Sequence, residues 1–277
     1  MPHPGFIVER TARTHVGIGM PNTIWRIVDY CRNQGLSWTA RRALRKLTRD
    51  DPYARAVKRH GGEDLPGIFT TIYQNNLWDS PESRSGWGST VANTASIRSG
   101  LERFIAERGI KSMVDAPCGD FNWMKELILP DDFRYIGIDI AQQMVDINNS
   151  KYASSRRRFM CGDITSDPIP TVDLVFCRDC LFHLSYKHIH QFVDRFLDSG
   201  AQFLMTTTHK NESAFLNADI LSGDFRLIDL FSPPFSFDRD VLFRVDDFVA
   251  PFPAREMCVW SRAQIKAAAK ARTSSCI

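Results

Sequence analysis

The feature that most constrains the fold is an alternation of short apolar runs with helical patterns that begins near residue 110. Strands that alternate with helices predict a mostly parallel sheet whose two faces are covered by helices, a doubly wound α/β fold. The predicted strands are 112–115, 135–139, 158–161, 174–177 and 203–207, and the predicted helices lie near 121–128, 141–149, 185–198 and 211–220.

The two ends of the chain follow different patterns. Residues 224–230, 240–249 and 256–260 have the pattern of strands with little helix between them, which predicts an antiparallel hairpin at one sheet edge. Before the alternation, apolar residues at helical spacing predict helices at 22–34, 37–46, 69–79 and 92–108. We therefore expect a helical N-terminal extension or cap over 1–84, the main domain over 85–262 and a basic C-terminal tail over 263–277.

Composition excludes several classes of protein. A chain of 277 residues with 43% hydrophobic and 24% charged residues is ordinary for a globular protein. Its apolar runs are far shorter than the roughly 18 residues that a membrane span needs, so we expect none. No secretory signal is visible, and the seven cysteines are scattered, which favours reduced thiols in a cytoplasmic protein.

Charge is unevenly distributed along the chain. Residues 1–60 hold 12 Lys and Arg against 4 Asp and Glu, and the segment from Arg255 onward holds 5 bases and 1 acid. Basic termini can contact phosphate groups or an acidic surface, and they can equally be solvated helix faces.

Carboxylates follow three successive predicted strands. Asp115 precedes a turn that contains Gly119, Asp139 ends the next strand, and Asp163 follows the third. Ligands of open α/β sheets bind beyond the carboxyl ends of the strands, where Asp139 can accept hydrogen bonds from ribose hydroxyls and Asp163 can bind an adenine amino group. Pro117 and Phe121 stand where a dinucleotide fingerprint has glycine, which disfavours a pyrophosphate ligand and a nicotinamide oxidoreductase. A nucleoside cofactor without phosphates, such as S-adenosylmethionine, remains.

These motifs resemble those of the class I S-adenosylmethionine-dependent methyltransferases. Residues 115–119 resemble the first motif, Asp139 the ribose-binding acid, Asp163 and Ile164 the adenine-side pair, and residues 173–184 the fourth motif. The resemblance covers residues 85–262 and implies a Rossmann-like, seven-stranded, mostly parallel sheet with an antiparallel edge strand. It implies that S-adenosyl-L-methionine, with S-adenosyl-L-homocysteine as its product, is bound by Asp115, Pro117, Cys118, Gly119, Asp139, Ile140, Asp163, Ile164 and Arg178.

The same resemblance implies direct SN2 transfer of a methyl group to an O or N atom of a small-molecule or sugar-type (glycan) acceptor. The candidate catalytic residues at the strand ends are His183, Asp179 and His209. An imidazole titrates near neutrality, which favours His183 as the base, whereas Asp179 is better suited to orient the acceptor. No His or acid spacing is typical of a metal site. Residues 1–60 are expected to help close the acceptor site.

An alternative function remains open at this stage. The chain could be a methyltransferase-like nucleic-acid-binding protein, or a nucleic-acid methyltransferase, that uses its basic termini. Nucleic acid is the less favoured partner, and the sequence predicts no oligomeric state.

Overall fold

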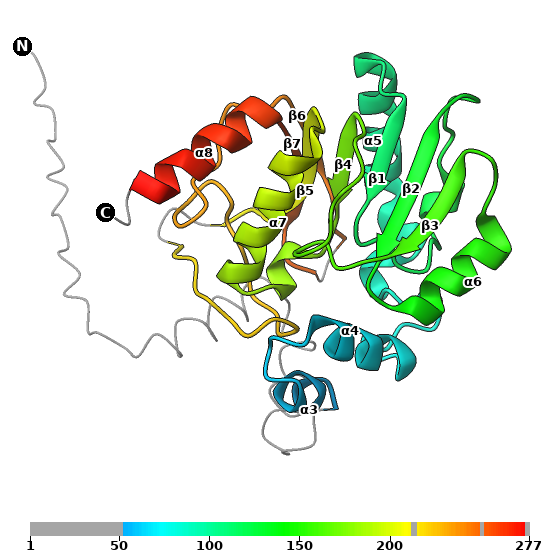
Figure 1. The fold of residues 1–277 in the computed structure, drawn as a ribbon, viewed down its shortest axis with the longest axis horizontal. Helices are drawn as coiled ribbons and strands as arrows, with labels where there is room; N and C mark the ends of the chain where they lie inside the picture. The colour runs from blue at the N-terminus through cyan, green and yellow to red at the C-terminus, as the bar shows by residue number, and fades with distance from the viewer. Residues whose placement is uncertain (1–51, 212–214, 250–251, 275–277) are drawn as a thin grey trace, which may run out of the picture.

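The computed structural model describes residues 52–211, 215–249 and 252–274. Within them, seven strands form one sheet in the order β3-β2-β1-β4-β5-β7-β6 (Figure 1). Strands β1 to β5 are parallel, and β7 is antiparallel to both of its neighbours, β5 and β6. The strands are β1 (Ser112–Asp115), β2 (Arg134–Asp139), β3 (Arg157–Cys161), β4 (Leu174–Cys177), β5 (Phe203–His209), β6 (Phe243–Asp246) and β7 (Arg255–Ser261).

This sheet confirms the predicted fold class and all five predicted parallel strands. The antiparallel hairpin expected near the C-terminus is β6–β7, and its antiparallel strand lies second from the edge. The central strands β1 and β4 are buried along their whole length, which is why they read as continuous apolar runs in the sequence.

Helices cover both faces of the sheet. Successive strand residues point to opposite faces, so that Val114 and Val175 belong to one core cluster, whereas Met113 and Leu174 belong to the other. The first cluster includes the apolar sides of α7 and α8, the second that of α5, and α6 packs beside β2 and β3. The bounds are α5 (Ala95–Arg108), α6 (Gln142–Tyr152), α7 (Tyr186–Ser199) and α8 (Arg262–Ser274).

The segment before the sheet supplies two more helices, α3 (Pro52–Arg59) and α4 (Leu65–Gln74). Asp64 caps α4 by accepting a hydrogen bond from the backbone N–H of Gly67, and a proline in the first turn supports this start. The helix predicted at 69–79 is therefore present but begins and ends earlier. Figure 1 shows α4 lying across one end of the sheet. The helices predicted at 22–34 and 37–46 lie outside the described residues.

Short 3₁₀ turns complete the described secondary structure. One of them precedes α5, so the helix predicted at 92–108 is confirmed in two parts. The turns are η1 (Trp87–Ser89), η2 (Ala92–Thr94), η3 (Met124–Glu126) and η4 (Leu181–His183).

The helix predicted at 121–128 is wrong. Only the 3₁₀ turn η3 forms there, because Phe121 adopts a left-handed backbone conformation with φ 59° that a helix start does not allow. Its ring packs instead against Tyr135, Tyr152 and Phe159.

Two predictions between β5 and β6 are also wrong. In place of the helix at 211–220, the described residues 215–220 run without helix, and the Asn217 amide bonds the backbone of Asp229 and Pro233, which competes with helix formation. No strand forms at 224–230. This segment instead makes single backbone hydrogen bonds with Phe182 and with His209, because β7 is already paired with the edge of β5.

The predicted C-terminal tail at 263–277 begins as helix α8. Ile265 is fully buried and Ala268 nearly so, and α8 packs against α7. A run of three alanines gives this helix only a weak apolar face, so the sequence pattern did not predict it.

Two expectations concern the environment of the protein. No helix in the described part of the chain is both long enough and apolar enough to cross a membrane. The five cysteines within the same residues are free thiols, as expected: Cys118, Cys161, Cys177, Cys180 and Cys258.

The carboxylate of Asp173 joins the amino ends of β1 and β4 through hydrogen bonds. One of its carboxylate oxygens accepts hydrogen bonds from the backbone of Lys111 and from the backbone and hydroxyl of Ser112, each at 2.9 Å. We expect Asp173→Asn to lower the free energy of unfolding by about 1–3 kcal/mol in urea denaturation, because bonds to a charged acceptor are lost.

The exposed Asp132, whose carboxylate lies 3.3 Å from the Lys111 ammonium, is the matched control. Asp132→Asn should leave the free energy of unfolding close to that of the wild type, because an exposed ion pair contributes little. Equal effects of the two substitutions would contradict the assignment of Asp173 as the joint.

Candidate active site

A cavity opens at the carboxyl ends of β1 to β4, where α4 and the following loop cover it. Its volume is about 1010 Å³ including the open space at its mouth. All nine residues that the sequence suggested for donor binding line it: Asp115, Pro117, Cys118, Gly119, Asp139, Ile140, Asp163, Ile164 and Arg178.

The turn after β1 is built around Gly119. Its φ of 57° is left-handed, and a Cβ there would lie 2.2 Å from the hydroxyl of Ser85. Its backbone N–H donates to Asp139 Oδ2 at 3.0 Å, which joins the ends of β1 and β2. Phe121 is buried in the aromatic cluster of the second core and does not line the cavity, so its bulk takes no space from a ligand.

Two buried carboxylates lie in the cavity wall. Asp115 accepts a hydrogen bond from the Tyr135 hydroxyl at 2.6 Å, and burial raises the pKa of Asp115 to about 8. Asp139 accepts backbone N–H groups from Gly119 and Ala141, one on each oxygen, and a further one from Ile140, whereas burial raises the pKa of Asp139 to about 6. The two carboxylate oxygens can still accept from a ligand.

Asp163, the third acid, shapes the turn after β3. Its Oδ1 accepts hydrogen bonds from the backbone N–H of Thr165 at 2.8 Å and from the hydroxyl of the same residue at 2.7 Å. Within the described residues, its Oδ2 accepts no hydrogen bond. Oδ2 can therefore accept from a ligand.

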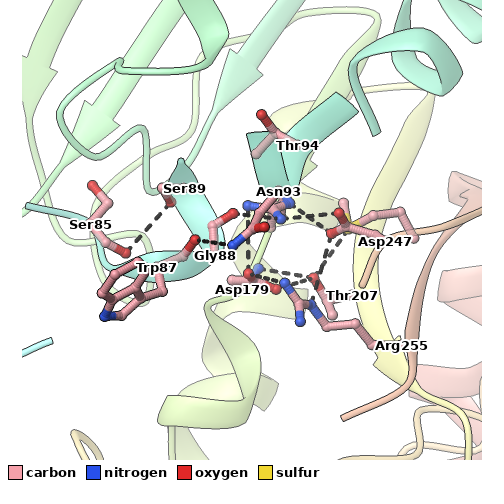
Figure 2. Close-up of polar contacts among 12 residues, drawn as sticks. Ser85, Trp87, Gly88, Ser89, Asn93, Thr94, Asp179, Thr207, Asp247 and Arg255 are labelled. Atoms are coloured by element: carbon pink, nitrogen blue, oxygen red, sulfur yellow. Dashed lines mark hydrogen bonds and ion pairs between the residues drawn. The ribbon is translucent and has the colours of Figure 1, made fainter. Parts of the chain in front are cut away.

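Arg178 and Asp179 follow β4 directly and belong to a network of charges, in which Figure 2 labels Asp179, Asp247 and Arg255. The Arg178 guanidinium donates to both carboxylate oxygens of Asp247, at 2.7 and 3.0 Å, and to the backbone carbonyl of Gly88 at 2.9 Å. Asp179 accepts from Arg255 at 2.9 Å, and the two arginines hold the pKa of Asp179 below its usual value against the opposing effect of burial. Asp179 is thus ionised near neutral pH, and most Arg178 donors are already used within the protein.

His183 lies in the cavity wall among aromatic rings. Its Nδ1 is 2.9 Å from the carbonyl oxygen of Asp224, which can only accept, so Nδ1 carries the proton and Nε2 the lone pair of the neutral ring. The Tyr53 hydroxyl is 3.3 Å from the same nitrogen, and the Trp78 and Phe225 rings have centroids 6.0 and 5.8 Å away.

His209, the third candidate base, does not line the cavity. It is buried, its Nδ1 accepts a hydrogen bond from the backbone of Ile228, and burial lowers the pKa of His209 to about 3. The ring is therefore neutral and packs against the loop after β5. In the sequence, His209 had looked equivalent to His183, because both were placed at strand ends.

Several residues of the cavity could not be found from motifs. Those from α4 and the loop after it face the strand ends: Leu65, Phe69, Tyr73, Trp78, Ser85 and Ser89. The aromatic character of Trp78 was a weak signal. Asp247 and Arg255, which hold Arg178 and Asp179 without lining the cavity, gave no signal, because they lie about 70 residues from Arg178 in the chain.

Comparisons with known proteins agree with this geometry. Residues 113–202 match a family model described as "Methyltransferase domain". The matched segment contains the motifs that resemble those of the class I S-adenosylmethionine-dependent methyltransferases, in agreement with that resemblance. Members of the matched family use S-adenosylmethionine as the methyl donor, as the motifs had implied. No curated protein matches the sequence.

Solved structures share the fold at low sequence identity. A Burkholderia thailandensis 1,6-didemethyltoxoflavin-N1-methyltransferase with bound S-adenosylhomocysteine is 14% identical, with a TM-score of 0.51 over 71% of this chain and 86% of that one. Human N-acetylserotonin methyltransferase is also 14% identical, with a TM-score of 0.47 over 84% of this chain and 69% of that one. The first of these likenesses confirms the methyltransferase fold.

The buried carboxylates predict how stability depends on pH. The folded state keeps the protons of Asp115 and Asp139 up to pKa values of about 8 and about 6, whereas an unfolded carboxyl loses its proton near 3.9. Their contribution to stability is therefore complete below about pH 4 and is lost as the pH rises through the folded pKa values.

In urea denaturation, the free energy of unfolding of Asp139→Asn should fall less between pH 5 and 7.5 than that of the wild type, by on the order of 1 kcal/mol. The exposed Asp146, on α6, is the control, and Asp146→Asn should follow the wild-type curve. Parallel curves for all three proteins would contradict a raised pKa at Asp139.

Proposed function

We propose that the protein transfers a methyl group from S-adenosylmethionine to an O or N atom of a small-molecule or sugar-type acceptor. The observation that carries the proposal is that one cavity contains both halves of such a site. The acids Asp115, Asp139 and Asp163 line it at the ends of β1 to β3, and Asp179 and His183 line it beyond β4.

The residues present fit the donor. The remaining lone pairs of Asp139 suit the two ribose hydroxyls, and the free oxygen of Asp163 suits the adenine amino group. Ile140 and Ile164 offer an apolar slot for the adenine ring. The buried Asp115 carboxylate suits the positively charged methionine end, where a nearby cation favours its ionised form.

The acceptor side of the cavity is apolar and aromatic. Leu65, Phe69 and Trp78 line it from α4 and the loop after it. The indole Nε1 of Trp78 is buried and has no hydrogen-bond partner among the described residues. The apolar and aromatic lining favours a small, ring-shaped acceptor.

The chain contributes position and one base. The bound donor supplies an electrophilic methyl group, and alignment of the acceptor atom with it accounts for much of the rate. His183 lines the cavity beyond β4 and is the candidate base for a proton of the acceptor, with its ring oriented by the hydrogen bond between Nδ1 and the Asp224 carbonyl. Asp179, ionised between two arginines, accepts a hydrogen bond from the acceptor and orients it.

The nucleic-acid alternative depends on the basic residues of the first 51 positions, which lie outside the described residues. No contact in the described part favours it, and the proposal is limited to small acceptors. The predicted role of residues 1–60 in closing the acceptor site falls largely in the same segment. Within the described part, α4 covers the cavity.

Donor binding tests the first half of the proposal. S-Adenosylhomocysteine at a hundred times its dissociation constant should stabilise the protein by about 2.7 kcal/mol in thermal denaturation. Asp139→Ala should raise the dissociation constant at least about tenfold in calorimetric titration, since two charge-assisted hydrogen bonds are lost. The control Asp146→Ala should bind like the wild type. An unchanged melting temperature of the wild type at millimolar ligand would overturn the proposal.

Catalysis tests the second half. Small hydroxylated and amino compounds, sugars included, are screened with methyl-labelled donor to find an accepted substrate. With that substrate, His183→Ala should lower kcat by about 10²–10⁴, with S-adenosylhomocysteine affinity within about twofold of the wild type. His190→Ala, on α7 and outside the cavity, should keep the wild-type rate. A near-normal rate for His183→Ala would leave positioning alone to explain catalysis.

A further inference from the structure

A five-residue segment, residues 85–89, crosses the cavity and contributes Ser85 and Ser89 to its lining. We call it the strap. It precedes the sheet in the chain and runs beside the turn that holds Gly119, where the Ser85 hydroxyl occupies the space of the missing Cβ. The strap therefore covers the donor side of the cavity rather than only its mouth.

The glycine turn fastens the first end of the strap. The backbone N–H of Asp120 donates to the Ser85 hydroxyl at 3.0 Å. The Asp120 carboxylate accepts from the Ser83 hydroxyl at 3.0 Å and from the backbone of Arg84 at 2.7 Å. These contacts are local to the donor motif and its immediate cover.

Charges from the far end of the chain fasten the second end. Arg178 donates to the carbonyl of Gly88, and its guanidinium is held by the bidentate pair with Asp247, whose side chain is fully buried. Arg255 lies 2.9 Å from Asp179 and 3.9 Å from Asp247. Figure 2 shows Asp179, Asp247 and Arg255 gathered beside Gly88.

The packing at Gly88 links the strap to the same charges. A Cβ on Gly88 would lie 2.8 Å from Asp179 Oδ2 and 3.4 Å from the Arg255 guanidinium. The backbone of Gly88 does not have a left-handed φ, so a larger residue would be opposed by this contact and not by backbone strain. The strap therefore packs directly against the side chains of Asp179 and Arg255, and Gly88 leaves no room for a larger residue.

We propose that Asp247 and Arg255, at the two ends of the β6–β7 connection, are positioning residues for the donor site. They hold Arg178 and Asp179 so that Arg178 keeps the strap closed over the methionine end of the donor. The inference rests on the proposed use of S-adenosylmethionine at this cavity. It assigns a role in donor retention to residues that touch neither donor nor acceptor.

The physical reason is charge balance in a buried place. Two arginines and two aspartates compensate one another, and removal of one leaves a partner charge buried without compensation. In Asp247→Asn, Arg178 loses its ionic partner and is drawn toward Asp179, which weakens its bond to the Gly88 carbonyl. The strap then opens more readily, and the donor dissociates faster.

The experiment measures S-adenosylhomocysteine binding to the full chain by calorimetry and its dissociation rate by stopped flow. Asp247→Asn and Arg255→Met should each raise the dissociation constant about tenfold or more, mainly through faster dissociation. Arg255→Lys should recover part of the loss, because it keeps the charge beside Asp179. Asp173→Asn, a carboxylate that joins the opposite ends of the strands, is the control for stability loss and should stay within about twofold.

A double-mutant cycle separates a positioning role from general destabilisation. Gly88→Ala should weaken binding by itself, and its effect should be much smaller in the Asp247→Asn background, since the strap is already released. Gly88→Ala and Asp173→Asn should be additive. If Asp247→Asn does not fold, Arg255→Lys and Gly88→Ala form the same cycle.

The outcomes distinguish the two proposals. Absence of S-adenosylhomocysteine binding to the wild type would overturn the proposed function itself. Wild-type binding with dissociation constants of Asp247→Asn, Arg255→Met and Gly88→Ala within about twofold of it would overturn the positioning role alone. Full additivity in the cycle with Gly88→Ala would overturn it as well.

Discussion

The ion pair between Arg178 and Asp247 is the interaction on which the walls of the cavity depend. Their side chains are 4% and 0% exposed, and the pair joins the end of β4 to the connection between β6 and β7. A buried charge is tolerated only with a partner of excellent geometry, and loss of one partner typically costs about 3–5 kcal/mol. The pair therefore holds the last two strands of the sheet and the strap in one arrangement around the site.

The cavity combines two electrostatic environments. On the donor side, Asp115 and Asp139 are buried with raised pKa values, so that they are only partly ionised until a cation or hydrogen-bond donors arrive. On the acceptor side, Asp179 is kept ionised by two arginines. In the proposed function, a cationic cofactor is bound by acids that it helps to ionise, whereas the acceptor meets a charge that is already present.

Much of the fold and half of the site could be predicted from the sequence because both are local. The five parallel strands are short apolar runs, and the acids that we propose bind the donor lie at or just after the ends of the first three. Prediction was wrong where distant contacts overrule local preference, as at Phe121, which gives up a helix for an aromatic cluster, and at Asn217, whose amide bonds a segment 12 to 16 residues away. His183 and His209 were both placed at strand ends in the sequence. Only the structure shows that His183 lines the cavity, whereas His209 is buried outside it.

The sequence by itself determined the parallel sheet, the order of its first five strands along the chain and the acids at their carboxyl ends, because hydrophobic period and turn chemistry act over a few residues. The tertiary structure alone decided which side chains close the cavity and which hold its walls. Leu65 and Trp78, which line the cavity, come from before the sheet. Asp247 and Arg255, which hold Arg178 and Asp179, come from its last hairpin, so these contacts cannot be predicted from spacing in the chain. Their roles arise because buried charges and apolar surface must find partners wherever the fold brings them.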